Sequence, residues 1–388
     1  MVFRTLCVIG TRPEAIKMAS VIKQLQLMPS IEHRVCVTGQ HRQMLDVTLD
    51  TFAITADYHL DVMTPNQTLT GLTTQILNKL TDVYDQYQPD LVLVHGDTTT
   101  ALAAALSAYY HRIPVAHVEA GLRTGQIDSP WPEEMNRQVI GTLAKWHFAP
   151  TTQAKHNLLR EGVPEETIYV TGNTVIDALY QMIHQLETQP TICQQLQQQF
   201  AFLNNHRKMI LVTGHRRENF GEGFERICKA LATIARLHPE VDIVYPVHLN
   251  PQVLLPVQSL LGDINNIHLL EPVDYVSCVY LMKTAYLILT DSGGIQEEAP
   301  SLGKPVLLMR DTTERPEAVD AGTVKLVGTD VEKIVSHVEL LLNNKQCYHQ
   351  MSIAQNPYGD GEAAARIVNI ISQHYCERIY KEEGVTSS

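Results

Sequence analysis

Short apolar runs alternate with longer helical patterns along almost the whole chain. In the first half the runs are TLCVIG (5–10), HRVCVTG (33–39), LVLVHG (91–96), PVAHVEA (114–120), WHFAP (146–150) and IYVTG (168–172). Helical patterns lie between them, for example at 13–28, 70–87, 98–111 and 133–145. This order predicts successive βαβ units on a parallel sheet. Several runs are apolar at consecutive positions, as expected when helices cover both faces of a sheet.

The alternation stops in a Gln- and Asn-rich stretch, 187–208, and then begins again. The later runs are MILVTGH (209–215), VDIVYPVH (241–248), IHLLEP (267–272), YLILTDSGG (286–294), PVLLMR (305–310) and TVKLVG (323–328). A length of 388 residues also suggests two or three domains. We therefore predict two Rossmann-like, doubly wound parallel-sheet domains, 1–171 and 172–360. The last helical stretch, 361–388, is expected to pack back on the first domain.

The composition excludes several classes of protein. Acidic residues outnumber basic ones by 42 to 30, which argues against a nucleic-acid binder. None of the seven cysteines forms a C-x-x-C pair, so no zinc site is predicted, and reduced thiols fit a cytoplasmic protein. No apolar run approaches the roughly 18 residues of a membrane span. The N-terminal run leads into GTRPE and is interpreted as a strand, not a signal peptide.

Residues that directly follow the predicted strands are the candidates for a site, because open parallel sheets bind ligands at the carboxyl ends of their strands. After the first run, Arg12 and Lys17 flank a helix predicted to begin at Pro13, and helix N-termini attract anions. The stretch GTRPEAIKMA matches neither G-x-G-x-x-G nor a P-loop, so neither site is predicted. Two exposed cations at a helix start remain the alternative interpretation.

Three later strand ends carry carboxylates. Asp97 follows the run at 91–96, Glu119 ends the run at 114–120, and Glu133 and Glu134 follow in SPWPEEMNRQ. Alone, Asp97 would as readily be a helix cap, and the two later acids would favour a helix dipole. Glu119 is harder to explain structurally, since a charge at the end of a buried strand is costly unless paired. Together they predict acid/base groups, at least one with a raised pKa. We expect Asp97 both to cap its helix and to transfer a proton.

The second half carries features suited to a diphosphate. His215 ends the run at 209–215, with two arginines after it, although a solvated basic turn is the alternative. Ser292, Gly293 and Gly294 open a helix whose amides can hold phosphates, with a plain Gly-rich turn as the alternative. Glu298 lies one turn further on, where it can bind ribose hydroxyls. Arg315 follows the next strand. No D-x-D triplet is present, so cationic side chains and helix dipoles must replace a metal.

Nine motifs occur along the chain. They are GTRPEAIKMA, VHGDTTT, HVEAGLRTG, SPWPEEMNR, TGHRREN, YPVHLNP, DSGGIQEEAPSLGKP, RDTTERPE and NPYGDGEA. In this order, from residue 5 to about 370, the chain resembles the non-hydrolysing UDP-N-acetylglucosamine 2-epimerase family. The resemblance implies a glycosyltransferase type B fold, with the substrate in a central cleft. It also implies a homodimer without a cofactor.

The implied activity is reversible epimerisation at sugar carbon 2, between UDP-N-acetylglucosamine and UDP-N-acetylmannosamine. In this family UDP is eliminated to give 2-acetamidoglucal and is then added back. The product supplies activated N-acetylmannosamine for cell-surface polysaccharides. Other activities left open are a hydrolysing epimerase that releases UDP and free N-acetylmannosamine, a type B glycosyltransferase, and a non-catalytic nucleotide-sugar sensor. A sensor would not need the three carboxylates.

The resemblance also implies roles for residues. The sugar-diphosphate site is expected to contain Arg12, Lys17, Asp97, Glu119 and His215. Asp97, Glu119 and Glu133 are the acid/base candidates, and His215 would assist the departure of UDP. Phosphate is assigned to Ser292, Gly293, Gly294 and Arg315, and ribose to Glu298. Val273 and Cys278 lie in the stretch that contacts uracil; some relatives have an aromatic residue at position 278, so Tyr275 or main-chain contacts are expected to substitute.

Many bacterial members bind a second substrate molecule as an activator. The polar positions associated with that site match Gln40, His41, Gln43, Gln67, Glu134, Arg137 and His248.

Overall fold

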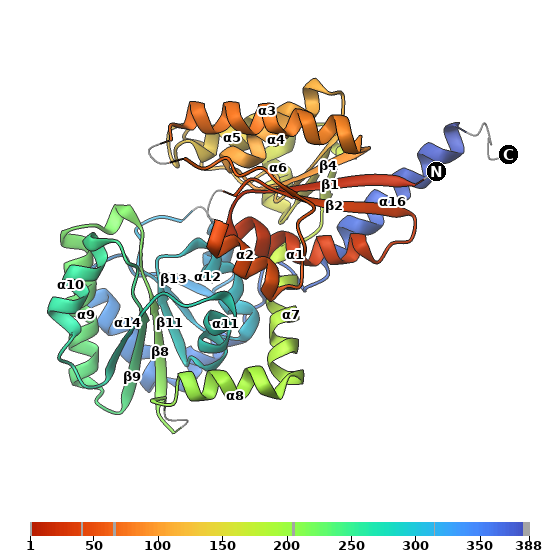
Figure 1. Ribbon diagram of the computed structural model, residues 1–388. Helices are drawn as coiled ribbons and strands as arrows, with labels where there is room; N and C mark the ends of the chain where they lie inside the picture. Colours follow the sequence, from red (N-terminus) through yellow and green to blue (C-terminus); the bar gives the residue numbers. More distant parts are fainter. Residues whose placement is uncertain (1, 40–41, 65–66, 204–205, 314, 383–388) are drawn as a thin grey trace. The chain divides into compact units, whose positions relative to one another are not determined.

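The computed structural model describes residues 2–39, 42–64, 67–203, 206–313 and 315–382; the side chains of 42–44 and 377–382 are outside this description. The chain divides into two compact units (Figure 1). Unit 1 contains residues 1–178 and 358–388, and unit 2 contains residues 179–357. Each unit is an α/β structure on one parallel sheet, as the alternation predicted.

Unit 1 contains a seven-stranded sheet in the order β3-β2-β1-β4-β5-β6-β7. Its strands are β1 (Phe3–Ile9), β2 (Ile31–Val37), β3 (Tyr58–His59), β4 (Leu91–His95), β5 (Val115–Val118), β6 (Trp146–Ala149) and β7 (Ile168–Val170). Its helices are α1 (Arg12–Gln26), α2 (Arg42–Thr51), α3 (Leu69–Tyr87), α4 (Thr99–Tyr110), α5 (Glu133–Leu143), α6 (Thr152–Arg160) and α16 (Ala363–Glu382), with a short 3₁₀ turn at Glu165–Thr167. Helix α7 (Thr174–Thr188) begins in unit 1 and continues into unit 2. The strand order reverses between β1 and β4.

Helices cover both faces of this sheet. In Figure 1, α3, α4 and α5 lie on one face of it and α1 and α2 on the other. Helix α4 is rich in alanine, and Ala101, Ala104 and Ala108 are fully buried, so α4 can approach the strands closely. Helix α16 packs against α1. The rings of Phe3 and Tyr375 stack at a centroid distance of 4.7 Å and help hold α16 in place.

Unit 2 repeats the design with a six-stranded sheet in the order β10-β9-β8-β11-β12-β13. Its strands are β8 (Lys208–Thr213), β9 (Val241–Pro246), β10 (Ile267–Leu270), β11 (Leu287–Thr290), β12 (Val306–Leu308) and β13 (Val324–Leu326). Its helices are α8 (Pro190–Gln199), α9 (Glu222–Leu237), α10 (Pro251–Leu261), α11 (Tyr275–Thr284), α12 (Gly293–Glu298), α13 (Pro316–Asp320), α14 (Val331–Asn343) and α15 (Lys345–Ser352), with 3₁₀ turns at Arg217–Asn219 and Ala299–Leu302. Here the strand order reverses between β8 and β11.

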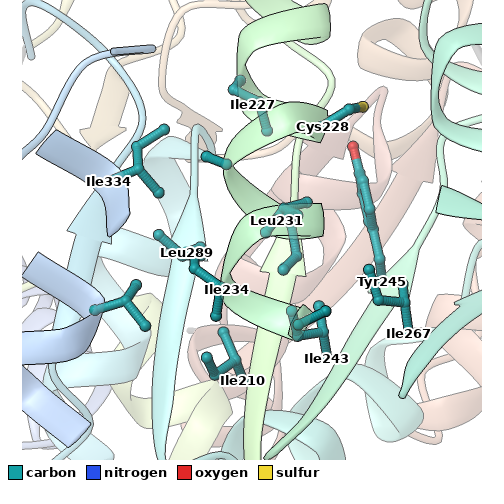
Figure 2. Close-up of a cluster of buried hydrophobic side chains, with 14 of the residues drawn as sticks. Ile210, Ile227, Cys228, Leu231, Ile234, Ile243, Tyr245, Ile267, Leu289 and Ile334 are labelled. Atoms are coloured by element: carbon teal, nitrogen blue, oxygen red, sulfur yellow. The ribbon is translucent and has the colours of Figure 1, made fainter. Parts of the chain in front are cut away.

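The core of unit 2 lies between this sheet and helices α9, α10 and α14. Figure 2 shows Ile227, Leu231 and Ile234 of α9 directed into the same cluster as side chains of the strands. These three residues are fully buried, and their spacing of three and four places them on one helix face. Burial of each such side chain stabilises the fold by about 1.5–3 kcal/mol. The core therefore fixes the strands whose ends carry the candidate site.

Within the part of the chain that the structure describes, no helix is long and apolar enough to cross a membrane. The same residues contain no group of three or more His, Cys, Asp or Glu side chains placed to hold a metal ion.

Candidate active site

The strand-order reversal of unit 1 collects two cation–carboxylate pairs. Lys17 from α1 forms an ion pair with Oε2 of Glu119, which follows β5, and both side chains are only 10% exposed. Arg137 from α5 places its Nη2 2.9 Å from Oδ2 of Asp97, which follows β4. Each carboxylate therefore has its own cation: the Lys17–Glu119 pair is largely buried, whereas the Asp97 side chain is 30% exposed beside a buried Arg137.

Asp97 does not cap helix α4, so that prediction was wrong. The N-cap is Thr98, whose Oγ1 accepts a hydrogen bond from the main-chain N of Ala101 at 3.0 Å. Gly96, at φ 65°, turns the chain so that Asp97 precedes the cap by one residue. Asn136 holds this turn by donating from Nδ2 to the main-chain O of Asp97 at 2.8 Å. The carboxylate of Asp97 is thus left to pair with Arg137.

Crowding and burial shift the acidity of Asp97. Burial raises its pKa from 3.8 to about 6, and the carboxylates of Glu119 and Glu133 add to this rise. The charges of Arg137 and Lys17 oppose the rise. The prediction that at least one of the grouped carboxyls has a raised pKa is confirmed for Asp97.

Glu119 has an unusual backbone and several polar neighbours. Its φ of 62° is in the left-handed region, which is unfavourable for a glutamate and is often found at functional sites. Besides Lys17, Oε2 accepts a hydrogen bond from Nδ2 of Asn173 at 3.1 Å. Nε2 of His95 lies 3.7 Å from the same oxygen. Burial lowers the pKa of His95 to about 4, so this ring is neutral at pH 7.

A buried glutamate that the sequence interpretation did not single out joins two of the loops. Glu14 accepts hydrogen bonds from the main-chain N of Gly10 (3.0 Å) and Thr11 (2.7 Å), and from the hydroxyls of Thr11 and Thr98 (both 2.8 Å). Burial raises its pKa to about 7 although these donors lower it. Thr11 caps α1, so the helix starts at Arg12, with Pro13 second rather than first. Arg12 is partly exposed at this start.

The two acids at the start of α5 have different surroundings. Glu133 is the first residue of the helix and is partly exposed. Glu134 is fully buried and accepts hydrogen bonds from the main-chain N of Thr124 and of Gly125 at 3.1–3.2 Å. Its Oε2 also lies 3.5 Å from Nε of Arg137. Glu134 therefore anchors the loop after Glu119 and connects it to Arg137.

Of the remaining activator positions, the structure describes the side chains of Gln67 and His248, which belong to different units. Gln67 donates from Nε2 to the main-chain O of Val62 at 2.9 Å. Gln40 and His41 lie outside the described residues, as does the side chain of Gln43. His248 belongs to unit 2, where its ring stacks 5.9 Å from that of His215.

In unit 2 the loop after β8 is fastened by a buried aspartate after β11. Asp291 accepts hydrogen bonds from the main-chain N of His215 (2.9 and 3.0 Å) and of Arg216 (2.9 Å), and from Nδ2 of Asn219 (3.2 Å). Asp291 is fully buried, whereas the His215 side chain is 43% exposed. The buried carboxylate of Asp291 thus holds the loop that carries the accessible imidazole of His215, at the strand-order reversal of unit 2.

Helix α12 begins with Gly293 and has Ser292 as its N-cap, as expected. Arg315 lies against this start: it donates from Nε to Oε1 of Glu297 at 2.6 Å, and a Cβ added to Gly293 would be 2.7 Å from its Nη1. Unpaired amides of a helix start, with a guanidinium beside them, are suited to an anion. Only glycine leaves room for this guanidinium.

The residues expected near the ribose and base lie on α11, on α12 and in the loop just before α11. Oε2 of Glu298 accepts a hydrogen bond from the hydroxyl of Tyr275 at 2.8 Å. Tyr275 is only 6% exposed, which leaves little of its ring for stacking on a base. Val273 and Cys278 are both partly exposed.

Comparison with known proteins identifies the family. A family model described as UDP-N-acetylglucosamine 2-epimerase matches residues 23–372. The UDP-N-acetylglucosamine 2-epimerase of Yersinia pestis is 61% identical over 371 residues, which cover 96% of this chain and 99% of the relative. That of Escherichia coli K12 is 56% identical over 371 residues, with the same coverage of 96% and 99%.

Solved structures agree. The UDP-GlcNAc 2-epimerase of Neisseria meningitidis, bound to UDP-GlcNAc, has a TM-score of 0.91 and 52% identity, covering 96% of this chain and 100% of that one. The Methanocaldococcus jannaschii enzyme, in complex with UDP-GlcNAc and UDP, has a TM-score of 0.80 and 35% identity, with coverage of 96% and 100%. The predicted glycosyltransferase type B fold is confirmed by these neighbours and by the two sheets. The chain belongs to the UDP-N-acetylglucosamine 2-epimerase family.

Proposed function

We propose that this protein reversibly converts UDP-N-acetylglucosamine into UDP-N-acetylmannosamine without releasing free sugar. The observation that carries the proposal is the pair of carboxylates, Asp97 and Glu119, each held by a cation at the strand-order reversal of unit 1. The family membership supports the same substrate, because relatives are named for this epimerisation and one was solved with UDP-GlcNAc bound.

The chemistry requires two proton transfers at carbon 2 and departure of UDP. A carboxylate takes the proton from carbon 2 while the bond between carbon 1 and the UDP oxygen breaks, giving 2-acetamidoglucal and UDP. A carboxyl group then returns a proton to the opposite face of carbon 2 as UDP bonds again to carbon 1. Asp97, Glu119 and Glu133 are the groups proposed for these transfers. A pKa of about 6 suits Asp97 to both directions near neutral pH.

Unit 2 is proposed to bind UDP and to stabilise it as a leaving group. The amides of Gly293 and Gly294 and the hydroxyl of Ser292, together with Arg315, would hold the diphosphate. His215 would assist departure, and Arg12 and Lys17 would complete the sugar-diphosphate site. Glu298 would bind the ribose, and the stretch containing Val273 and Cys278 would bind uracil.

Further properties are proposed from the family resemblance. They are a homodimer, a cytoplasmic location, a supply of activated N-acetylmannosamine to cell-surface polysaccharides, and a substrate molecule that acts as activator at Gln40, His41, Gln43, Gln67, Glu134, Arg137 and His248. The pairing of Arg137 with Asp97 favours a direct connection between that second molecule and the catalytic carboxylate.

Incubation with UDP-N-acetylglucosamine in deuterated water, followed by NMR, tests the proposal. Reversible epimerisation predicts deuterium at carbon 2 in both intact nucleotide sugars. Free N-acetylmannosamine as the main product would instead identify a hydrolysing epimerase. Absence of both exchange and turnover would leave a sensor or a transferase, and addition of sugar acceptors would separate these two.

A further inference from the structure

Asn173, directly before α7, makes hydrogen bonds through its main chain and through both ends of its side-chain amide. Nδ2 donates to Oε2 of Glu119 at 3.1 Å, Oδ1 accepts from the main-chain N of Val175 at 3.1 Å, and the main-chain N donates to O of Tyr358 at 2.7 Å. The residue is 2% exposed. Because the N–H of Val175 needs an acceptor, Oδ1 must face it, which leaves the amide NH₂ to face the carboxylate.

Glu119 needs contacts that fix its direction. Its left-handed backbone is unfavourable by itself, so surrounding contacts must hold it there. Lys17 neutralises the carboxylate, but an ammonium on a flexible stem has little directional preference. The amide of Asn173 is directional, because its other end is fixed at the start of α7. Of these two partners, Asn173 is therefore the one that can set the orientation of Oε2.

Asn173 is also anchored where the chain leaves and re-enters unit 1. Helix α7 passes into unit 2 after Ala178, and the chain returns at Tyr358. Asp177 binds the returning segment by accepting hydrogen bonds from the main-chain N of Ala363 (3.2 Å) and of Ala364 (2.8 Å). Asn173 is bonded to the same segment through Tyr358. The outgoing and returning segments thus form one hydrogen-bonded support for the amide.

We propose that Asn173 is a positioning residue for the epimerisation, which orients Oε2 of Glu119 from this support. The inference rests on the proposed function, because Glu119 must act on the sugar for its orientation to matter. No proton passes to or from Asn173. Its effect is confined to how well Glu119 is placed for proton transfer, where small misplacements cost rate.

The variant Asn173→Asp tests this with almost no change in size. Aspartate keeps an acceptor for Val175 and the main-chain bond to Tyr358, but it turns an acceptor instead of a donor toward Glu119. We expect kcat to fall at least about 100-fold. The KM for UDP-N-acetylglucosamine and the Kd for UDP should stay within about threefold of wild type, because the residues proposed to bind UDP are unchanged.

A matched control removes a similar bond that does not touch the carboxylate. Asn157 donates from Nδ2 to the main-chain O of Gly121 at 2.9 Å, in the same loop as Glu119. Asn157→Ala should keep kcat within about threefold of wild type. In a Glu119→Gln background, Asn173→Asp should cost little additional kcat, since the group that it positions is gone.

The outcomes separate the two proposals. If wild-type protein shows neither carbon-2 exchange nor turnover, the proposed function fails. If wild type is active, near-normal kcat in Asn173→Asp overturns the positioning role, as does an equal loss in Asn157→Ala or a full additional loss in the Glu119→Gln background. Should Asn173→Asp not fold by circular dichroism, Asn173→Ser replaces it, because serine can still cap Val175 but cannot reach Glu119.

Discussion

Arg137 contacts two carboxylates at once: its Nη2 lies 2.9 Å from Oδ2 of Asp97, and its Nε lies 3.5 Å from Oε2 of the buried Glu134. Glu134 in turn holds the main chain of Thr124 and Gly125. A residue expected at an activator site is therefore part of the same hydrogen-bonded cluster as the proposed catalytic carboxylate. Any ligand that moves Arg137 would also change the charge environment of Asp97.

The first prediction concerns Asp97→Asn. Proton transfer at carbon 2 requires the carboxyl, so kcat should fall at least about 1,000-fold, a loss within the range typical of acid/base groups. Folding should persist, because Arg137 retains Glu134 as a partner and Asn136 still holds the main-chain O of residue 97. NMR turnover and thermal unfolding measure the two effects. Asp82→Asn, at an exposed position of α3, is the control and should leave both unchanged.

The sheets could be predicted from the sequence because buried parallel strands are continuous apolar runs, and both halves contain them. Strand β3 escaped prediction, since it has only two residues and pairs with β2 through Tyr58 and His59 alone. Helix α8 escaped because its Gln-rich sequence buries little besides Leu196.

For the site, the rule that ligands bind after parallel strands pointed to the loops of Asp97, Glu119 and His215, and these loops do follow β4, β5 and β8. The rule could not give their partners. Glu14 meets Thr98 across 84 residues and Asn173 meets Glu119 across 54, and such pairs arise only when the sheet is assembled. The cap of α4 was misassigned because the helix begins one residue later than predicted. Gly96 adopts a positive φ, and Thr98 rather than Asp97 then takes the N-cap position.

The second prediction concerns pH and His117. This ring is fully buried, Nε2 lies 2.7 Å from the main-chain O of Gly96, and burial lowers its pKa from 6.5 to about 3. As the pH falls below about 6.5, His117 binds a proton in the unfolded chain but stays neutral in the folded chain. Its contribution to the free energy of unfolding is therefore complete above pH 6.5 and is lost as the pH falls toward 3. Between pH 7.5 and 5 this residue alone should remove about 2 kcal/mol from the free energy of unfolding.

The measurement is urea unfolding at both pH values, with His117→Gln as the variant. Glutamine can still donate to Gly96 but does not titrate. Between pH 7.5 and 5 the free energy of unfolding of the variant should therefore fall by about 2 kcal/mol less than that of wild type. His156→Gln, at an exposed position of α6, should follow wild type at both pH values. Parallel curves for His117→Gln and wild type would show that His117 is not excluded from protonation in the folded state.

The third prediction concerns Gly293→Ala. A Cβ at this position would be 2.7 Å from Nη1 and 2.9 Å from Cζ of Arg315, so the guanidinium must move away from the start of α12. If this start holds the diphosphate, calorimetric titration with UDP should show affinity reduced at least about tenfold. Gly223→Ala is the control, since a Cβ there meets atoms no closer than 3.6 Å. Equal affinities for UDP in both variants would remove Arg315 from the diphosphate site.

The last prediction concerns Asp291→Asn, because Asp291 is fully buried and accepts hydrogen bonds from His215, Arg216 and Asn219. An asparagine that keeps its oxygen at the Oδ2 position places its NH₂ group where Oδ1 accepts from the main-chain N of His215 at 3.0 Å. Two buried donors then face each other, at a cost of about 1–3 kcal/mol. The loop that carries His215 should then lose its fixed position. We expect a lower free energy of unfolding for unit 2 and a lower kcat, with the loss of kcat exceeding what residual unfolding explains at 25 °C.

Urea unfolding followed by circular dichroism, combined with turnover by NMR, checks this expectation. Asp330→Asn is a matched control: Asp330 is exposed and caps α14 by accepting from the main-chain N of Lys333 at 2.9 Å. Asparagine caps helices as well as aspartate does, so this variant should stay within about 0.5 kcal/mol of wild type. Unchanged stability and kcat in Asp291→Asn would mean that the His215 loop is held by its other contacts, and that Asp291 is dispensable for presenting the imidazole.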